Sequence, residues 1–227
     1  MIHMEYRYEL HCHTAQTSPC SQLPAEELVR LYQAAGYDGV VITDHFTASV
    51  EGNCSETGWQ TAVDRFLAGY EAANSAGAAC GLTVILGAEI RFPGSLNDYL
   101  VYGLTEQLLR ENEWLYEKDL PSFYQFAENN GLLVIQAHPF REPCTPSDPR
   151  YLHGVEVFNG HKGHRSHNGC ALQFAQENGL IEIAGSDCHY NYAVGTAAVC
   201  FSRRPQSSRD IAVLLRTNDF QPEINRN

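Results

Sequence analysis

The stretch YRYELHCHT (6–14) ends a strand-like run with two histidines. Alternate residues of a β-strand point to the same side of a sheet, so His11 and His13 leave one face together where the strand stops. Core packing gives no reason to place two imidazoles there, whereas a metal ion does. The stretch therefore predicts a metal site at the end of the first strand.

The rest of the chain alternates strand-like and helix-like stretches. Apolar runs bounded by glycine or polar residues indicate buried strands, and an early proline, early acids and a late glycine mark the first helix. We expect strands at 6–12, 38–45, 81–90, 98–104, 131–139, 154–160, 179–189 and 196–201, and helices at 24–37, 56–79, 121–130, 167–178 and 207–217. This alternation is typical of a parallel sheet.

Length and strand number together favour a barrel. The chain has 227 residues, slightly short for an eight-fold barrel of about 250 residues. Seven or so strands favour a closed or nearly closed sheet, and we find no linker, repeat or low-complexity stretch. The prediction is an α/β fold, a distorted and trimmed TIM-like barrel that forms a single domain over residues 1–227.

Charge and hydropathy exclude several classes of protein. Acidic residues outnumber basic ones by 27 to 15, for a net charge of −12. This balance disfavours electrostatic binding of long duplex nucleic acid over a broad surface, but bound divalent cations would still allow an anionic substrate. No apolar run reaches about 18 residues, so we expect no membrane span. The polar start MIHMEYRYEL does not resemble a signal peptide, so a cytoplasmic location is expected.

Eight cysteines are scattered along the chain without a CxxC pair. In a chain of this length they favour free or buried thiols over a disulfide framework. Cys12 and Cys188 each lie between two candidate ligands, so we expect both to point away from them.

Ligand-type residues follow nearly every predicted strand. They are His11 and His13, Asp44 and His45, Glu89, His138, Asn159 and His161, and Asp187 and His189. In parallel α/β folds this end of the sheet carries the active site. Imidazole and carboxylate together suit zinc, iron or manganese, and two ions about 3.5–4 Å apart can clamp a phosphoryl group.

Some histidines have a simpler explanation. His3 and His153 are expected to be structural. His161, His164 and His167 fall in the polar run GHKGHRSHN, for which a solvated loop is expected.

Five motifs in order resemble the polymerase and histidinol phosphatase (PHP) superfamily, and the resemblance covers nearly the whole chain. They are ELHCHT (9–14), ITDH (42–45), GAEI (87–90), AHP (137–139) and GSDCH (185–189). The resemblance implies a distorted (β/α)7 barrel with a di- or trinuclear metal site. It places His11, His13, Glu89 and Asp187 around a first metal, with Glu89 bridging to a second metal held by His138. A third metal would be held by His45 and His189.

Two stretches depart from the family pattern. The family often supplies an acid or histidine just after the first motif, where this chain has AQTSPCS (15–21), so Ser18, Gln16 or water would substitute and the third metal would be weak. The family also often has a histidine at the strand after GAEI, where this chain offers Asn97, Asp98 or Tyr99. His161 or His164 would then complete the second metal.

The resemblance implies hydrolysis of a small phosphate mono- or diester by a water activated by two or three Zn, Mn or Fe ions. Catalytic roles fall to Asp187, His45 and His189, either imidazole donating a proton if it is free of metal. Arg141 is expected to hold the phosphate bidentately. Arg91 is the second candidate for substrate binding, ahead of Lys162 and Arg165. Asn159 either orients water or substrate or caps a loop. The expected partner is a small phosphorylated molecule, and the oligomeric state stays open.

Two other functions compete with this prediction. An amidohydrolase-type C–N hydrolase also opens with HxH and carries a late aspartate, but it commonly uses a carboxylated lysine, and no lysine ends a predicted strand here. A metal-binding accessory module with weakened catalysis would explain the departures, although the chain keeps both Asp187 and His189.

Overall fold

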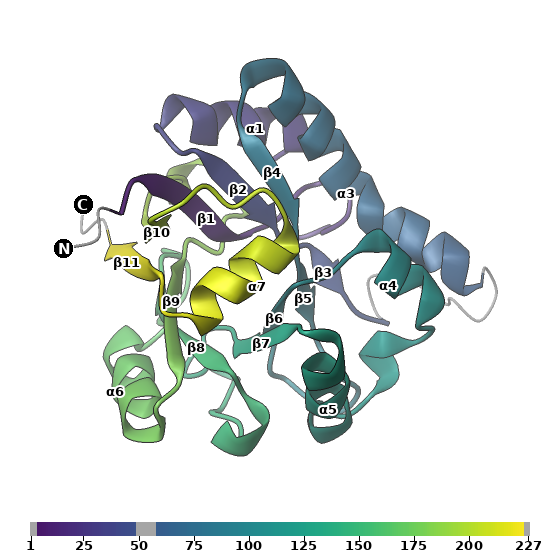
Figure 1. The fold of residues 1–227 in the computed structure, drawn as a ribbon, viewed down its shortest axis with the longest axis vertical. Coiled ribbons are helices and arrows are strands. Elements are labelled where there is room, and N and C mark those ends of the chain that lie inside the picture. The colour runs from purple at the N-terminus through teal and green to yellow at the C-terminus, as the bar shows by residue number, and fades with distance from the viewer. Residues whose placement is uncertain (1–3, 49–57, 225–227) are drawn as a thin grey trace.

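Strands and helices alternate along the chain (Figure 1). The computed structural model describes residues 4–48 and 58–224. The strands are β1 (Tyr6–Cys12), β2 (Gly39–Ile42), β3 (His45–Phe46), β4 (Thr83–Leu86), β5 (Ala88–Ile90), β6 (Tyr99–Tyr102), β7 (Leu133–Gln136), β8 (Gly154–Asn159), β9 (Ile181–Gly185), β10 (Ala197–Phe201) and β11 (Phe220–Ile224). The helices are α1 (Ala25–Ala34), α3 (Trp59–Cys80), α4 (Glu106–Glu111), α5 (Leu120–Asn130), α6 (Asn168–Asn178) and α7 (Ser208–Arg216), with short 3-10 helices η1 (Leu115–Glu117), η2 (Pro149–Tyr151) and η3 (Asn191–Ala193).

The strands follow one another around a ring. They form two sheets, ordered β11-β10-β1-β2-β4 and β3-β5-β6-β7-β8-β9. These sheets continue into each other, because β3 follows β2 and β5 follows β4 almost directly. Between them, the Gly87 N–H donates to the Ile42 carbonyl (2.8 Å) and the Glu89 N–H donates to the Asp44 carbonyl (3.0 Å). The ring positions are therefore β1, β2/β3, β4/β5, β6, β7, β8 and β9, as in a TIM-like barrel of seven strands.

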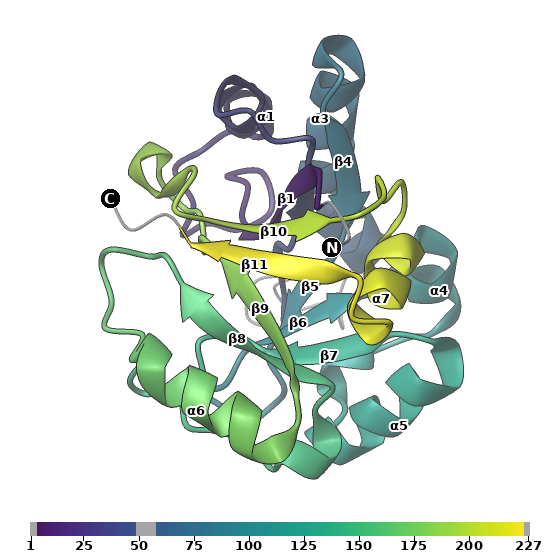
Figure 2. The ribbon, with the colours of Figure 1, turned by 60° about the vertical axis from the view of Figure 1, so that its left-hand side comes forward.

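The seam of this ring lies between β1 and β9. An isolated parallel bridge pairs Cys12 with Cys188, and the His13 N–H donates to the Cys188 carbonyl (3.0 Å). The buried Glu9 carboxylate also joins the two edges, because it accepts a hydrogen bond from the Ser186 N–H (3.0 Å). Elsewhere along β1, strand β10 pairs with it instead, and β10 and β11 lie beside β9 (Figure 2).

The expectation of an all-parallel sheet is wrong for two strands. Strand β6 runs antiparallel to both β5 and β7, and β10 runs antiparallel to β1 and β11. No helix separates β5 from β6 in the chain, so β6 returns alongside β5 as in a hairpin, whereas a parallel pair needs a crossover. The helical segment from α4 to α5 then lies between β6 and β7.

Several element boundaries also differ from the predictions. The predicted strand 38–45 is divided into β2 and β3, and 81–90 is divided at Gly87 into β4 and β5. The predicted strands 131–139 and 179–189 end early, so their last residues form turns. The short helix α4 and the strand β11 were not predicted, and residues 56–57 of the predicted helix 56–79 lie outside the described residues.

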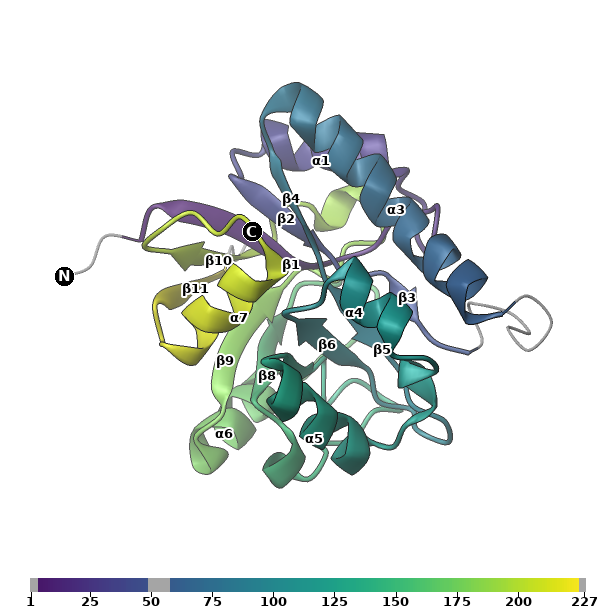
Figure 3. The same cartoon turned by 45° about the vertical axis from the view of Figure 1, so that its right-hand side comes forward.

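One apolar cluster fills the ring and closes one of its ends. It contains side chains of seven strands, among them Tyr8, Leu10, Leu100, Ile135 and Ile183. Helix α7 adds Ile211, Leu214 and Leu215 to the same cluster and lies across the strands (Figure 3). Because this end is sealed by apolar side chains, polar chemistry is confined to the other end.

Helices cover the outer face of the ring. Helices α1 and α3 pack on β2 and β4 through one buried cluster, and α3, α5 and α6 pack on β3, β5, β6, β7 and β8 through another (Figure 1). Within the described residues, no helix combines the length and the apolar character that crossing a membrane requires.

Candidate metal centre

Imidazole and carboxylate side chains converge at the open end of the ring. They come from β1, β3 and β5 and from the turns after β7 and β9, and they are His11, His13, His45, Glu89, His138, Asp187 and His189. His45 is partly exposed, and the other six are buried. The structure thus brings together all seven residues that the sequence proposed as ligands.

Glu89 lies at the middle of this group. Its Oε1 is 3.3 Å from His11 Nε2 and 3.2 Å from His138 Nε2. Its Oε2 is 3.4 Å from His13 Nε2 and 2.9 Å from His45 Nδ1. A carboxylate whose two oxygens face different pairs of imidazoles is placed to bridge two ions.

Asp187 lies near two of these imidazoles, those of His11 and His13, and adds a third, that of His189. Its Oδ1 lies 3.5 Å from both His11 Nε2 and His13 Nε2, and 3.2 Å from His189 Nδ1. Its Oδ2 accepts a hydrogen bond from Arg141 (3.0 Å). Asp187 therefore connects the imidazole group to a guanidinium.

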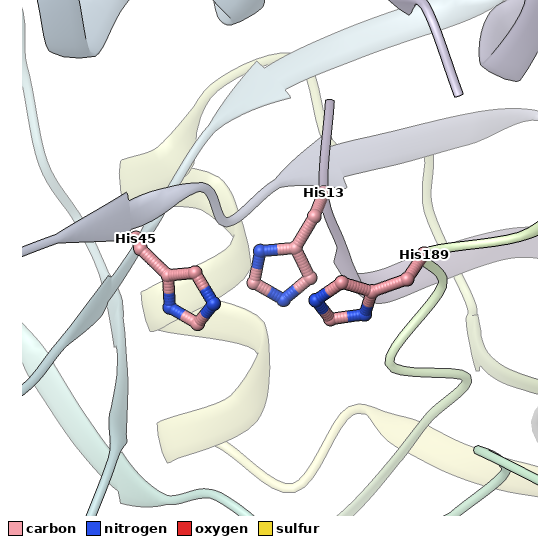
Figure 4. Close-up of side chains that lie close together, drawn as sticks. All are labelled: His13, His45 and His189. Carbon is pink, nitrogen blue, oxygen red and sulfur yellow. The ribbon is translucent and has the colours of Figure 1, made fainter. Parts of the chain in front are cut away.

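Two buried nitrogens in the group lack a hydrogen-bond partner, His11 Nε2 and His13 Nε2. Leaving such atoms unpaired is costly, and a bound cation would account for both. Among the described residues, four sets of donor atoms lie within 4.8 Å of one another: His13/His45/His189, His11/His13/Glu89, His11/His138/Asp187 and Asp98/His138/Cys144. The rings of the first set point toward one another (Figure 4). Nitrogen and carboxylate oxygen suit zinc, manganese and iron, so these residues fit metal ions.

The local charge favours cations. Burial alone would lower the pKa of His11, but neighbouring carboxylates, Glu156 first among them, hold that pKa well above its usual value. Burial would also lower the pKa of His45, and Glu89 raises it well above the usual value instead. Burial and neighbouring imidazoles lower the pKa of His13 well below its usual value, which keeps that ring neutral. Imidazoles bind metal in their neutral form, so an ion at these rings would compete with protons.

Glu156, in the middle of β8, supports the centre and was not predicted. Its Oε1 lies 2.8 Å from His11 Nδ1, and its Oε2 accepts a hydrogen bond from the His138 N–H (3.0 Å). A carboxylate on the far nitrogen of a ligating histidine fixes the orientation and the tautomer of the ring. The available signal was a glutamate inside GVEVFN, where a strand buried on both faces is expected to be apolar.

Asn159 faces the carboxylates rather than the open cavity. Its side-chain amide donates to Glu156 Oε2 (3.0 Å) and to Asp187 Oδ2 (3.1 Å). Its carbonyl oxygen accepts a hydrogen bond from the His161 N–H (3.1 Å). The geometry therefore favours a positioning role for this buried amide, where the sequence left both a contact with water or substrate and a loop cap open.

Two candidate ligands lie on strained turns rather than on strands. His138 has φ of 28° and Asp187 has φ of 50°, both in the left-handed region. Such conformations cost about 1–3 kcal/mol each in residues other than glycine and are common at functional sites. Gly185, just before the second turn, is required because a Cβ there would lie 2.5 Å from Glu156 Oε1 and from His11 Cβ.

A cavity of about 240 Å³ opens onto the centre. Its walls include Arg141, Arg91, His161 and His164. Arg91 donates two hydrogen bonds of 2.7 Å to Asp98, so its guanidinium is already engaged. The structure thus places both candidate arginines at the cavity, with Arg141 directly against the centre.

Of the three residues offered for the second metal, only Asp98 reaches the centre. Its Oδ2 lies 3.9 Å from His138 Nε2. Asn97 and Tyr99 instead contact the Ser147 hydroxyl, at 3.0 and 2.8 Å. A buried cysteine, Cys144, lies 3.8 Å from His138 Nδ1 on the other side of that ring.

The remaining histidines divide between the cavity and the surface. His161 and His164 stack with centroids 4.6 Å apart and line the cavity, and because His161 is partly exposed and His164 is exposed, both keep the solvent contact expected of a solvated loop. Three other residues of that loop are exposed: Lys162, Arg165 and His167. His153 accepts a hydrogen bond from the Val134 N–H (3.0 Å), as expected of a structural histidine, and His3 lies outside the described residues.

The cysteines within the described residues are free thiols, and Cys54 lies outside them. Cys12 and Cys188 are buried in the outer apolar cluster, away from the ligands, as expected. Cys20 is different, because its Sγ lies 3.2 Å from His189 Nε2. Burial alone would raise its pKa, but His189 and His45 lower it to about 6.

Comparison with known proteins agrees with this geometry. The PHP-associated family model (PHP_C) matches residues 165–218. No curated protein matches this chain. PsfC from Pseudomonas syringae has a similar structure, with a TM-score of 0.69 and 16% identity over 97% of this chain and 92% of PsfC.

Two further solved structures are similar. A two-domain protein from Bacteroides vulgatus, described as containing a predicted PHP-like metal-dependent phosphoesterase, gives a TM-score of 0.67 and 18% identity over 97% of this chain and 65% of that one. An amidohydrolase from Chromobacterium violaceum, solved with sulfate and no metal, gives 0.53 and 14% identity over 94% of this chain and 97% of that one.

Fold and site together define an α/β protein with a ring of strands that carries a candidate multinuclear metal centre at one end. Within that class, the PHP-associated family model matches residues 165–218, and the fold is similar to that of a protein described as containing a predicted PHP-like phosphoesterase; both agree with the resemblance that the five motifs carry.

Proposed function

We propose that this chain is a metal-dependent phosphoesterase that hydrolyses a small phosphate mono- or diester. The observation that supports this most directly is the position of Glu89 among four imidazoles. The guanidinium of Arg141 lines the same cavity. A cation-binding centre next to an anion-binding side chain suits a phosphate ester better than a neutral amide.

The ligands would be the seven converging residues, and the ions would be two or three of zinc, manganese or iron. When bound, such ions activate water as a nucleophile and neutralise the charge of the phosphoryl group. Glu89 would bridge the first two ions, and Glu156 and Asn159 would hold the ligands in place. His45 and His189 line the cavity, and with only two ions bound, one of these two rings would be free to protonate the leaving group.

Arg141 is the proposed phosphate-binding residue. Its planar fork can donate two parallel hydrogen bonds to phosphate oxygens, and it lies 3.0 Å from Asp187 at the edge of the centre. Arg91 is a weaker candidate because Asp98 already occupies its fork. A cavity of about 240 Å³ favours a small ester over a polymer, and the acidic surface disfavours duplex nucleic acid.

The decisive experiment combines metal analysis with hydrolysis of p-nitrophenyl phosphate and its bis-ester. We expect bound transition metal in the purified protein and turnover that depends on Mn²⁺, Zn²⁺ or Fe²⁺. Asp187→Ala is expected to lose metal and activity together, whereas Arg141→Lys keeps the metal and loses about 10- to 100-fold in kcat/KM, the cost of a lost charge-assisted hydrogen bond. Asp148→Ala, at the partly exposed N-cap of η2, is the matched control.

Full phosphoesterase activity in Asp187→Ala would overturn this proposal. The amidohydrolase likeness gives C–N hydrolysis as the second candidate, and assays with N-acyl amino acids and dihydropyrimidine rings test it. Stoichiometric metal binding without turnover of any ester or amide would instead support the accessory-module alternative.

A further inference from the structure

The loop after the first motif contributes a side chain to the centre, but not one that the sequence pattern suggested. The Ser18 hydroxyl donates to Asp44 Oδ1 (2.6 Å) and accepts from the His45 N–H (3.0 Å). The side-chain carbonyl oxygen of Gln16 accepts a hydrogen bond from the Ala25 N–H at the start of α1 (3.0 Å). Both side chains are therefore committed to structural contacts.

Cys20 lies beside His45 and His189, the two imidazoles that the resemblance assigns to a third metal. Its Sγ lies 3.2 Å from His189 Nε2, and it lines the cavity together with His45. The Nδ1 atoms of both rings already face carboxylates: His189 Nδ1 faces Asp187, and His45 Nδ1 faces Glu89. The thiol does not compete for these two nitrogens. The thiol thus meets the nitrogen of His189 that remains available to an ion.

Backbone contacts fix the loop in this position. The Ser21 N–H donates to the Ser18 carbonyl (2.9 Å), which closes a turn around Cys20. The Ser21 hydroxyl donates to the His13 carbonyl (3.0 Å), and the Gln22 N–H donates to the His189 carbonyl (2.9 Å). The loop is therefore tied to two of the segments that carry imidazoles.

A second observation points to a ligand at this place. His13 is fully buried, and its Nε2 has no hydrogen-bond partner. The rings of His13, His45 and His189 point toward one another (Figure 4), with donor atoms within 4.8 Å. A cation shared by these three imidazoles would give the unpaired His13 nitrogen a partner.

We propose that Cys20 supplies a thiolate ligand to a third ion held by His45 and His189. Binding would form an S–metal bond and release the thiol proton to solvent. A thiolate is a soft donor, so this position would prefer zinc over manganese, unlike an acidic residue in the same place. The inference rests on the metal centre of the proposed function but not on its reaction. With both imidazoles bound to metal, neither would protonate the leaving group.

Cobalt(II) is the probe, because a thiolate–Co²⁺ bond has a strong charge-transfer absorption in the near ultraviolet. The wild-type chain, reduced and fully loaded with Co²⁺, is expected to show this band. Cys20→Ser is expected to lose the band and to bind one ion fewer per chain in equilibrium dialysis. The control variant Cys170→Ser, which removes an exposed free thiol on α6, is expected to keep both the band and the full number of bound ions.

A rescue variant separates ligation from folding. Cys20→Asp is expected to regain the ion without the band and to shift the preference of the third position toward Mn²⁺. A wild-type protein that loads Co²⁺ without the band overturns the inference, as does a band that persists in Cys20→Ser and disappears in Cys144→Ser. If the band behaves as expected but no phosphate ester is hydrolysed, the proposed function fails and this inference stands.

Discussion

Carboxylates face both ring nitrogens of His11, but only the one at Nδ1 is hydrogen-bonded to it. Its Nε2 faces Glu89 at 3.3 Å, and its Nδ1 faces Glu156 at 2.8 Å. The first carboxylate belongs to the ligand set, and the second orients the ring from behind. Histidine ligation therefore depends on a residue that would touch neither metal nor substrate.

Glu156→Gln is expected to weaken metal binding by about 10- to 100-fold without unfolding the protein. The glutamine keeps the volume, but its one carbonyl oxygen can satisfy only some of the donors that now converge on the carboxylate, and it carries no charge. Competition with a coloured zinc chelator measures the affinity. Glu182→Gln on neighbouring β9 is the control, and equal affinities for the two variants would rule out the positioning role.

Helix α3 positions the first two motifs by a close approach at Gly69. A Cβ at Gly69 would lie 2.0 Å from Thr14 Oγ1, 2.5 Å from Asp44 Oδ2 and 3.0 Å from Thr17 Oγ1. Thr14 and Asp44 are hydrogen-bonded to each other at 2.6 Å, one residue away from His13 and His45 respectively. The packing of this helix is thus coupled to the geometry of two candidate ligands.

Gly69→Ala is therefore expected to destabilise the protein by about 1–3 kcal/mol through overpacking. Alanine normally stabilises a helix relative to glycine by up to about 1 kcal/mol. Gly169→Ala in α6, where a Cβ meets nothing within 4 Å, is expected to stabilise the protein as alanine normally does. Urea unfolding measures both variants. A stabilised Gly69→Ala would show that α3 does not approach the motifs as closely as described.

A second junction, at His153, joins α5, β7 and α7 and responds to pH. Its Nδ1 accepts from the Val134 N–H (3.0 Å), and its Nε2 lies 2.7 Å from Glu128 Oε1 and 3.1 Å from Arg216. Burial lowers the pKa of His153 below its usual value of 6.5. The unfolded chain therefore takes up the proton first as the pH falls. The stabilisation that neutral His153 gives the fold is complete at pH values above its ordinary pKa of 6.5, and it is lost as the pH falls through the pKa of the folded state.

The expected result is a pH-dependent difference between wild type and His153→Gln. In metal-free protein, we compare how much more stable the wild type is than His153→Gln at two pH values. This difference in the free energy of unfolding should be smaller one pH unit below 6.5 than one pH unit above it. Urea titrations at the two pH values measure this difference. A difference that is constant, or that grows as the pH falls, would contradict the lowered pKa.

At the scale of the whole molecule, the two ends of the ring differ in chemistry. Helix α7 seals one end with Ile211, Leu214 and Leu215. The other end gathers buried carboxylates and imidazoles whose charges favour cations. Ions that bind only the folded centre must therefore stabilise the entire fold.

Removing metal is expected to lower Tm by about 5–10 °C. A site filled at 100 times its Kd contributes about 2.7 kcal/mol, and each kcal/mol corresponds to about 2–4 °C for a chain of this size. Thermal unfolding with EDTA, and again after adding Zn²⁺, measures the effect. Asp187→Ala should melt at the same temperature in both conditions; an EDTA-insensitive wild type would mean that no metal is bound at the centre.

The sequence alone determined the class of fold and the identity of the seven converging residues. Periodic apolar runs located most strands, because burial of alternating or continuous apolar residues depends mainly on local pattern. Ligand residues followed strand ends, and the strands of such a fold share one open end. Five ordered motifs then resembled those of the PHP superfamily.

Only the tertiary structure decided which neighbours support those residues. Pairing partners depend on contacts between residues far apart in the chain, so the antiparallel β6 and the β1–β9 seam could not be read from local pattern. The same applies to Glu156 and Cys20. Each reaches a histidine more than a hundred residues away in the chain, Glu156 at His11 and Cys20 at His189, and no local signal encodes such a contact. Side-chain environment is a property of the folded ring, and the chemistry of these two residues follows from it.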